Sequence, residues 1–340
     1  MILLKQWNVI GVNIRGHFAL FFYAKLLIVE QIVYISQQKV VIAKMCSYNE
    51  NMCSVARKNN IAIVAQKEIK IMKNILEAPF VRDMCEATAN MYRLGWDERN
   101  GGNISYLLDE AEVAEYLDLN HVIRCIPTGF DASALIGKIF IVTGTGKYFK
   151  NVEKDPAYNL GIVRIAKDGT TAELLWGYTD GGKFTSEFPA HMMSHIARLS
   201  VDSQHRVVMH SHPTYTIAMN TVCTTEEKEF THKLWQSNTE CIVVFPDGVG
   251  VLPCMVCGTN EIGIATAEKM KHFRLVVWTN HGIYGTGKTM DEAFGLIETV
   301  EKTAQIYMLS LGHVVNVIPD SILKELATLW NFKPLEGILQ

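Results

Sequence analysis

The sequence lacks the features that mark secreted, membrane-spanning and nucleic-acid-binding proteins. Its eight cysteines follow no disulfide-framework spacing, so in a chain of 340 residues they indicate reduced thiols and a cytoplasmic location. Its net charge of −3 gives no electrostatic reason to expect a nucleic-acid partner. The most apolar N-terminal stretch, residues 16–36, contains Lys25 and Glu30 and has no small-residue cleavage site, so we expect neither a transmembrane helix nor a signal peptide.

The first 71 residues also lack turn punctuation. They contain no proline and no aspartate, and glycine stands only at positions 11 and 16, so nothing divides them into packed elements. Nine Lys/Arg against three Glu give them a net charge of +6, which leaves −9 on the other 269 residues. Two interpretations stay open: an amphipathic segment at a membrane surface, or a dispensable or poorly ordered extension before a functional polypeptide that begins at Met72.

From Met72 onward the hydrophobic pattern alternates between helical and strand periods, without internal repeats. This alternation predicts one α/β domain over residues 72–340. Expected helices cover residues 75–94, about fifteen residues from Thr185, and 213–221, 225–236, 260–272, 289–311 and 320–329. Expected strands cover 103–108, 139–142, 161–165, 173–176, 206–211, 240–245 and 274–279.

Two histidines one residue apart, His210 and His212, close the apolar run at 207–209. Side chains alternate along a strand, so both histidines face the same way with α-carbons about 6.6 Å apart, a spacing that allows two imidazoles to bind one metal ion. His281 follows another apolar strand. Three histidines with an open fourth position are typical of a catalytic zinc site, although a histidine that merely ends a strand fits the spacing of His281 equally well.

Glu187 stands at the expected helix start, with Thr185 or Ser186 as N-cap and Pro189 in the first turn. A carboxylate there can simply complement the helix dipole, but the free amides and two hydroxyls also favour an anion site. The loops at 100–103 and 143–146 could both approach a phosphate with backbone amides and short polar side chains. Together these segments predict a phosphorylated ligand.

Six motifs follow one another between Met72 and the C-terminus. They are Gly95-Trp-Asp-Glu-Arg-Asn-Gly-Gly-Asn103, Ile141-Val-Thr-Gly-Thr-Gly-Lys147, Thr185-Ser-Glu-Phe-Pro-Ala-His191, His210-Ser-His212, Ser237-Asn-Thr-Glu-Cys-Ile-Val-Val-Phe-Pro-Asp-Gly-Val-Gly250 and Asn280-His-Gly282. Together they resemble the class II aldolase/adducin family, and in particular its rhamnulose-phosphate branch. Residues 1–71 fall outside the resemblance. Thr145 stands where the family often has serine, and Cys254 and Cys257 belong to no family motif, so we interpret their CxxC spacing as packing or chance rather than a zinc or redox site.

The resemblance implies an α/β fold of three layers, α/β/α, around a central mixed, mostly antiparallel sheet. It implies a lyase that cleaves L-rhamnulose 1-phosphate into dihydroxyacetone phosphate and L-lactaldehyde in rhamnose catabolism. It also implies a cytoplasmic homotetramer with active sites between subunits and with no membrane or nucleic-acid partner. The roles it assigns are one Zn²⁺ per subunit on His210, His212 and His281, acid/base catalysis by Glu187, a phosphate site of Asn100, Asn103, Thr145, Thr185 and Ser186, and contact of Glu240 from a neighbouring subunit with the aldehyde half.

Two alternatives stay open. A fuculose-phosphate aldolase or a ribulose-phosphate 4-epimerase of the same family would share the metal site. A non-catalytic binding module, like the adducin head domain, is disfavoured because the three histidines and Glu187 are all present.

Overall fold

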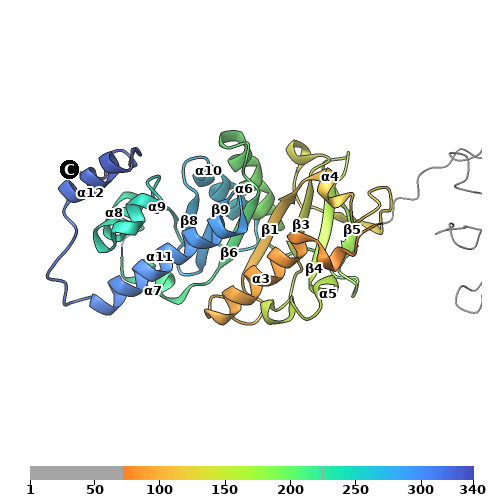
Figure 1. Ribbon diagram of the computed structural model, residues 1–340, viewed down its shortest axis with the longest axis horizontal. Helices are drawn as coiled ribbons and strands as arrows, with labels where there is room; N and C mark the ends of the chain where they lie inside the picture. Colours follow the sequence, from red (N-terminus) through yellow and green to blue (C-terminus); the bar gives the residue numbers. More distant parts are fainter. Residues whose placement is uncertain (1–71, 224) are drawn as a thin grey trace, which may run out of the picture. The chain divides into compact units, whose positions relative to one another are not determined.

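A nine-stranded sheet forms the centre of the computed structural model, which describes residues 72–223 and 225–340 (Figure 1). The predictions for residues 1–71 lie outside the described residues. The strand order is β2-β5-β4-β3-β1-β6-β9-β8-β7; the neighbours are antiparallel except for β7 and β8, which are parallel. The strands are β1 Asn103–Leu108, β2 Arg124–Pro127, β3 Ile139–Thr143, β4 Leu160–Ile165, β5 Thr171–Gly177, β6 Val207–Ser211, β7 Gly250–Leu252, β8 Leu275–Trp278 and β9 Gly282–Gly287.

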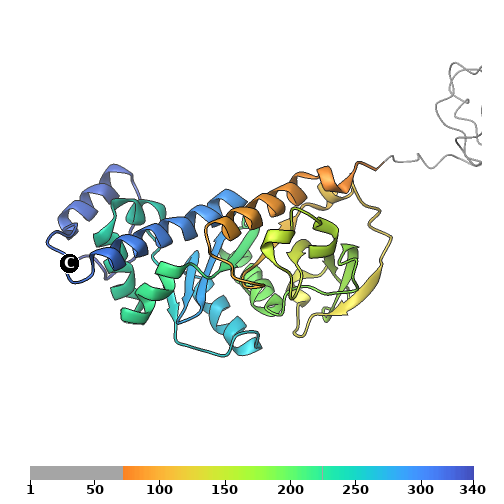
Figure 2. The same ribbon diagram turned by 90° about the horizontal axis from the view of Figure 1, so that it is seen from below.

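Helices cover both faces of this sheet, so the three-layer prediction is confirmed. The α-helices are α3 Pro79–Arg93, α4 Glu110–Val113, α5 Pro156–Asn159, α6 Phe188–Val201, α7 Thr214–Val222, α8 Glu227–Ser237, α9 Thr239–Val244, α10 Asn260–Met270, α11 Met290–Ser310 and α12 Asp320–Leu329, with 3₁₀ turns at Ile75–Glu77, Ser133–Leu135 and Phe149–Asn151. Figure 2 shows α3 and α11 on one side of the sheet and α10 on the other. Val207 and Met209 of β6 pack toward α3 and α11, whereas Val208 packs toward α6 and α10.

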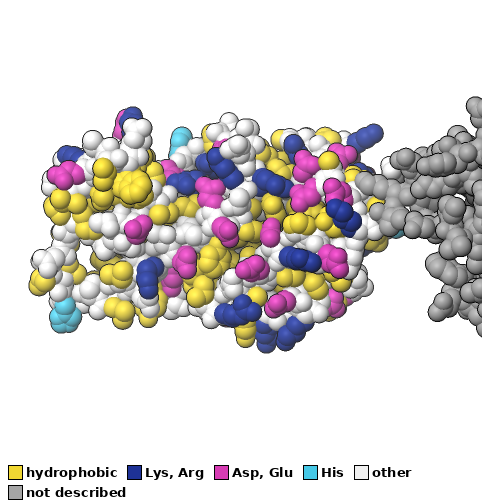
Figure 3. Space-filling view, in the orientation of Figure 1, with side chains coloured by type: hydrophobic (Ala, Val, Ile, Leu, Met, Phe, Trp, Pro, Cys, Tyr) yellow, Lys and Arg dark blue, Asp and Glu magenta, His cyan; other side chains and the backbone are white. Residues whose placement is uncertain are grey.

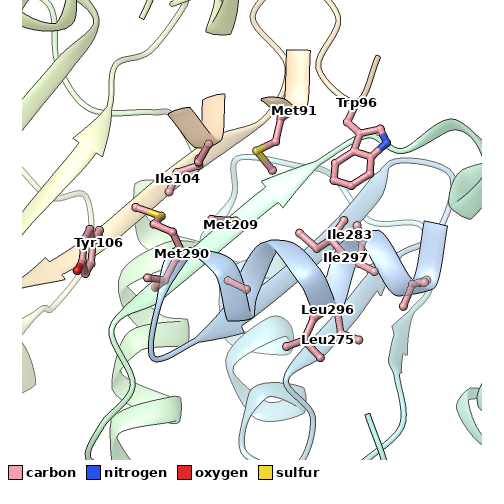
Figure 4. Close-up of a cluster of buried hydrophobic side chains, with 14 of the residues drawn as sticks. Met91, Trp96, Ile104, Tyr106, Met209, Leu275, Ile283, Met290, Leu296 and Ile297 are labelled. Carbon is pink, nitrogen blue, oxygen red and sulfur yellow. The ribbon is translucent and has the colours of Figure 1, made fainter. Parts of the chain in front are cut away.

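The larger core lies between the sheet and α11. Met209, Leu275 and Ile283 project from three neighbouring strands onto Leu296 and Ile297 of that helix (Figure 4). Because both faces of the sheet are buried, the central strands contain almost continuous apolar runs, which is why strands β1, β3, β6 and β8 could be predicted from sequence.

The predicted strand over 240–245 is wrong, because that segment is the helix α9. The Asn238 side chain accepts a hydrogen bond from the Glu240 amide at 3.2 Å and so caps the helix, while Cys241 and Ile242 are buried. A short apolar run fits a buried helix as well as a strand, and the cap decides between them.

The strand β9 was not predicted, because its sequence Gly-Ile-Tyr-Gly-Thr-Gly contains three glycines. The close approach of α11 explains one of them. A β-carbon at Gly285 would lie 2.7 Å from a side-chain carbon of Ile297 and 2.9 Å from the carbonyl oxygen of Ala293. Glycine is therefore required there by helix packing rather than by a turn.

The surface over α3 and α11 mixes the two signs of charge. Figure 3 shows Lys/Arg and Asp/Glu side chains interspersed over this face of the described residues. Within the described residues, no helix combines the length and the apolar character needed to cross a membrane.

Candidate active site

The three predicted metal ligands converge at one end of β6. His210 is on that strand, His212 follows it, and His281 lies in the tight turn between β8 and β9, where Asn280 has a φ of 60°. One ring nitrogen of each histidine lies within 4.8 Å of those of the other two. The turn therefore brings His281 beside His210 and His212. The alternative that His281 only ends a strand does not explain this position.

Hydrogen bonds fix the proton positions of two of these rings. His210 Nδ1 lies 3.1 Å from the carbonyl oxygen of Ile283, and His212 Nδ1 lies 3.1 Å from both carboxylate oxygens of Glu98. Carbonyl and carboxylate oxygens only accept, so each Nδ1 donates its proton. Burial and the neighbouring histidines lower the pKa of His210 well below its usual value, which keeps that ring neutral.

The Nε2 atoms of His210 and His212 face each other at 3.2 Å. Histidine binds a metal ion through an unprotonated nitrogen, so both Nε2 lone pairs would then be directed at one shared position. A tetrahedral ion with Zn–N bonds of about 2.0–2.1 Å would hold two ligand nitrogens about 3.3 Å apart. The residues present therefore fit a bound metal ion, and the partners of both Nδ1 atoms are those that commonly orient histidine ligands.

Glu187 lies beside this cluster and is 8% exposed. Its Oε2 accepts hydrogen bonds from Asn103 Nδ2 and from the hydroxyl of Tyr284, both at 3.0 Å. Oε2 is also 3.6 Å from His210 Nε2, and Oε1 is 3.9 Å from His281 Nε2. Sequence reasoning missed Tyr284 because it lies on β9, a strand that was not predicted; in the structure it pairs directly with His210 across β6 and β9. Burial and the Glu187 carboxylate raise the pKa of Tyr284 well above its usual value, so its hydroxyl stays protonated and donates.

The predicted helix cap needs a correction. The helix α6 begins at Phe188 with Glu187 as its N-cap, and neither Thr185 nor Ser186 has that role. Thr185 Oγ1 instead accepts a hydrogen bond from the Glu187 amide at 3.2 Å. This hydrogen bond between residues i and i+2 orders the backbone before the helix, and the Glu187 side chain faces the histidines.

A pocket of about 190 Å³ collects the predicted anion-binding residues in front of the histidines. A β-carbon at Gly101 would lie 2.8 Å from His212 Nδ1, so glycine allows this loop to approach the imidazole. A larger hollow of about 520 Å³ between α12 and the C-terminal residues contains none of the predicted site residues. The smaller pocket, in front of the histidines, is lined by Asn100, Gly101, Gly102, Asn103, Gly144, Thr145, Gly146, Thr185, Ser186, Glu187, His212 and His281.

The positions of three further residues bear on the sequence-based expectations. Glu240 is exposed on α9 and does not line the pocket. Cys254 and Cys257 are free, exposed thiols, so packing does not explain them. The Cys257 sulfur lies within 4.8 Å of a Glu187 oxygen and a His281 nitrogen, a proximity that no sequence motif indicated.

The family model for the class II aldolase and adducin N-terminal domain matches residues 82–308. The chain belongs to the class II aldolase/adducin family, and it is a metal-dependent class II aldolase, a lyase. It is 58% identical to rhamnulose-1-phosphate aldolase of Listeria monocytogenes serotype 4a over 269 residues, covering 78% of this chain and 98% of that protein. It is 46% identical to rhamnulose-1-phosphate aldolase of Klebsiella pneumoniae over 272 residues, covering 79% of this chain and 99% of that protein.

Among solved structures, a sugar-phosphate aldolase from Thermotoga maritima is similar, with a TM-score of 0.59 and 29% identity over 69% of this chain and 96% of that one. These comparisons confirm the predicted family, fold class and enzyme class. They also remove the non-catalytic module as an alternative.

Proposed function

We propose that the protein cleaves L-rhamnulose 1-phosphate into dihydroxyacetone phosphate and L-lactaldehyde in rhamnose catabolism, with one Zn²⁺ per subunit on His210, His212 and His281. The observation that carries the proposal is the convergence of three histidine ring nitrogens, with the Nε2 atoms of His210 and His212 3.2 Å apart, beside a buried carboxylate and a polar pocket. The identity to rhamnulose-1-phosphate aldolases supports this substrate over other sugar phosphates.

The phosphate of the dihydroxyacetone half would bind in the polar pocket. Among its described lining residues none is Lys or Arg, so recognition would come from neutral donors: the amides of Asn100 and Asn103 and the hydroxyls of Thr145, Thr185 and Ser186. Backbone amides of the two glycine-containing loops would add donors at short range. The sugar carbons would then lie between the phosphate pocket and the histidines.

A bound Zn²⁺ supplies Lewis-acid stabilisation of the negative charge that develops on substrate oxygens when the C3–C4 bond breaks. In cleavage the C4 hydroxyl loses its proton as C4 becomes the aldehyde carbon, and the Glu187 carboxylate would accept this proton and deliver it to C3; in synthesis both transfers run in reverse. Both of the described hydrogen bonds to this carboxylate fall on Oε2, so we assign the proton transfer to Oε1. The Tyr284 hydroxyl and the Asn103 amide hold the carboxylate in place during the transfer.

Glu240 has a separate role in this proposal. Its exposure on α9, away from the pocket of its own chain, supports a contact with the aldehyde half in a neighbouring subunit. The assembly is then a homotetramer in the cytoplasm, with active sites between subunits. We also propose that residues 72–340 are the catalytic domain and that residues 1–71 are dispensable, since 269 residues of this chain cover 98% of a relative.

Release of dihydroxyacetone phosphate from L-rhamnulose 1-phosphate tests the proposal. We expect the full-length protein to release it, to lose the activity on chelation and to regain it with Zn²⁺. Activity that survives complete removal of metal would contradict the proposal. Activity restored by other divalent ions but not by Zn²⁺ would contradict the zinc assignment.

A further inference from the structure

A buried hydrogen-bonded chain begins behind Glu187 and leads away from the pocket. Asn103 donates from Nδ2 to Glu187 Oε2 at 3.0 Å, and its Oδ1 contacts Nε2 of His191. His191 Nδ1 lies 2.7 Å from the hydroxyl oxygen of Ser105. Both His191 and Ser105 are fully buried, and neither belongs to the metal cluster or the phosphate pocket.

The chain continues through two more histidines. The same hydroxyl oxygen of Ser105 lies 2.9 Å from His195 Nε2, and His195 Nδ1 lies 2.9 Å from His205 Nε2. His195 is fully buried and His205 is 2% exposed. Burial lowers the pKa of His205 to about 3, as it does for His191, and lowers that of His195 well below its usual value. Each ring is therefore neutral and carries one proton.

Periodicity explains how the sequence builds this chain. Asn103 and Ser105 are two residues apart on β1, so their side chains lie on the same face of the sheet. His191 and His195 are four residues apart on α6, so both face the same way from the helix that covers that face. The strand and the helix thus interleave amide, imidazole and hydroxyl groups in one line.

The ionised Glu187 fixes the direction of every bond in this line. A carboxylate only accepts, so Asn103 turns its NH₂ toward it, and its Oδ1 must accept from Nε2–H of His191. His191 Nδ1 then accepts the hydroxyl proton of Ser105. The oxygen of Ser105 accepts from Nε2–H of His195, whose Nδ1 accepts from Nε2–H of His205. In this arrangement every donor points toward Glu187 and no two donors face each other.

We propose that Ser105, His191, His195 and His205 are positioning residues that act through Asn103 on Glu187. They hold the Asn103 amide so that its NH₂ faces the carboxylate. A flipped amide would direct Oδ1 at the carboxylate and NH₂ at the donor His191, and both contacts are repulsive. The line therefore excludes the flip and gives the carboxylate one fixed orientation. The effect of these residues on catalysis rests on the proposed function of Glu187. The proton positions on the three histidine rings do not depend on that function.

The tautomers provide the direct test. In ¹⁵N spectra of the full-length protein labelled on histidine, we expect His191, His195 and His205 to be neutral and protonated on Nε2. His210 should be protonated on Nδ1, the opposite tautomer. An Nδ1-protonated His191 or His195 would overturn the proposal. If these tautomers are found and rhamnulose 1-phosphate is not cleaved, the proposed function fails while the hydrogen-bond directions stand.

Substitution of the hydroxyl tests the effect on catalysis. Ser105→Ala removes the donor to His191, and we expect kcat to fall about tenfold, with unchanged bound metal and a shifted tautomer signal of His191. Ser194→Ala is the matched control, because Ser194 is fully buried on α6 and its hydroxyl has no hydrogen-bond partner among the described residues. If Ser105→Ala does not fold, Ser105→Cys keeps a weak donor and should give an intermediate kcat. Wild-type kcat together with an unchanged His191 signal in either variant would overturn the proposal.

Discussion

The hydroxyl of Tyr284 offers the sharpest single-atom perturbation of the site. Tyr284→Phe removes the donor 3.0 Å from Glu187 Oε2 and keeps the ring, which stacks on His210 with centroids 4.4 Å apart. A hydrogen bond to a charged group contributes about 1.5–3 kcal/mol. Because about 1.4 kcal/mol corresponds to a factor of ten, kcat should fall about 10- to 100-fold if the bond acts fully in the transition state.

The assay is steady-state cleavage of rhamnulose 1-phosphate, with bound metal measured on the same preparation. Since the His210 contacts remain, metal content should match that of the wild type. Tyr106→Phe is the control, because Tyr106 is a buried tyrosine on β1 that packs in the core on the other face of the sheet. Its kcat should be unchanged. A Tyr284→Phe variant with wild-type kcat would refute the assignment of Tyr284 as a holder of the Glu187 carboxylate.

Three further predictions concern the metal site, the chain start and acid stability. Glu187→Gln should keep its metal and lose about 10²–10⁴-fold in kcat, whereas His212→Ala should lose metal as well; normal turnover in Glu187→Gln would require another base. A chain that starts at Met72 should be as active as the full chain, and an inactive or aggregated product would show that residues 1–71 are needed. Folding lowers the pKa of buried His191 and His205 to about 3 from an unfolded value near 6.5, so between these values only the unfolded chain binds the proton. As the pH is lowered from about 6.5, the free energy of unfolding of the metal-free protein should therefore decrease by about 1.4 kcal/mol per pH unit for each histidine. Urea unfolding measured at several pH values tests this, and a free energy that does not change with pH would contradict their burial as neutral rings.

Sequence periodicity predicted the elements that are long or uniformly apolar. The strand β1 and the helix α12 have the expected bounds, and β6 and α11 differ by one residue at their ends. The segment 240–245 was assigned wrongly because so short a run of mostly apolar residues does not distinguish a buried helix from a strand. The strand β9 was missed because its glycines are required by a neighbouring helix, and this requirement is visible only once α11 is in place.

The site residues that could be predicted are those that lie close together in sequence or stand at the ends of predicted elements. His210 is on a strand and His212 directly follows it, and His281 and Glu187 stand at element ends where site residues gather. Tyr284, Cys257 and Glu98 were not found because none of them has a sequence spacing that marks it as a ligand or as a partner of one. Their roles depend on strand register and loop placement, which one sequence does not reveal.

The central claim is that this site cleaves a phosphorylated rhamnulose rather than a related sugar phosphate. Its most direct test compares kcat/KM of the Zn²⁺-loaded full-length protein for L-rhamnulose 1-phosphate and L-fuculose 1-phosphate under the same conditions. We predict a clear preference for rhamnulose 1-phosphate, with dihydroxyacetone phosphate and L-lactaldehyde as products. A preference for fuculose 1-phosphate, or no cleavage of either sugar phosphate, would contradict the claim.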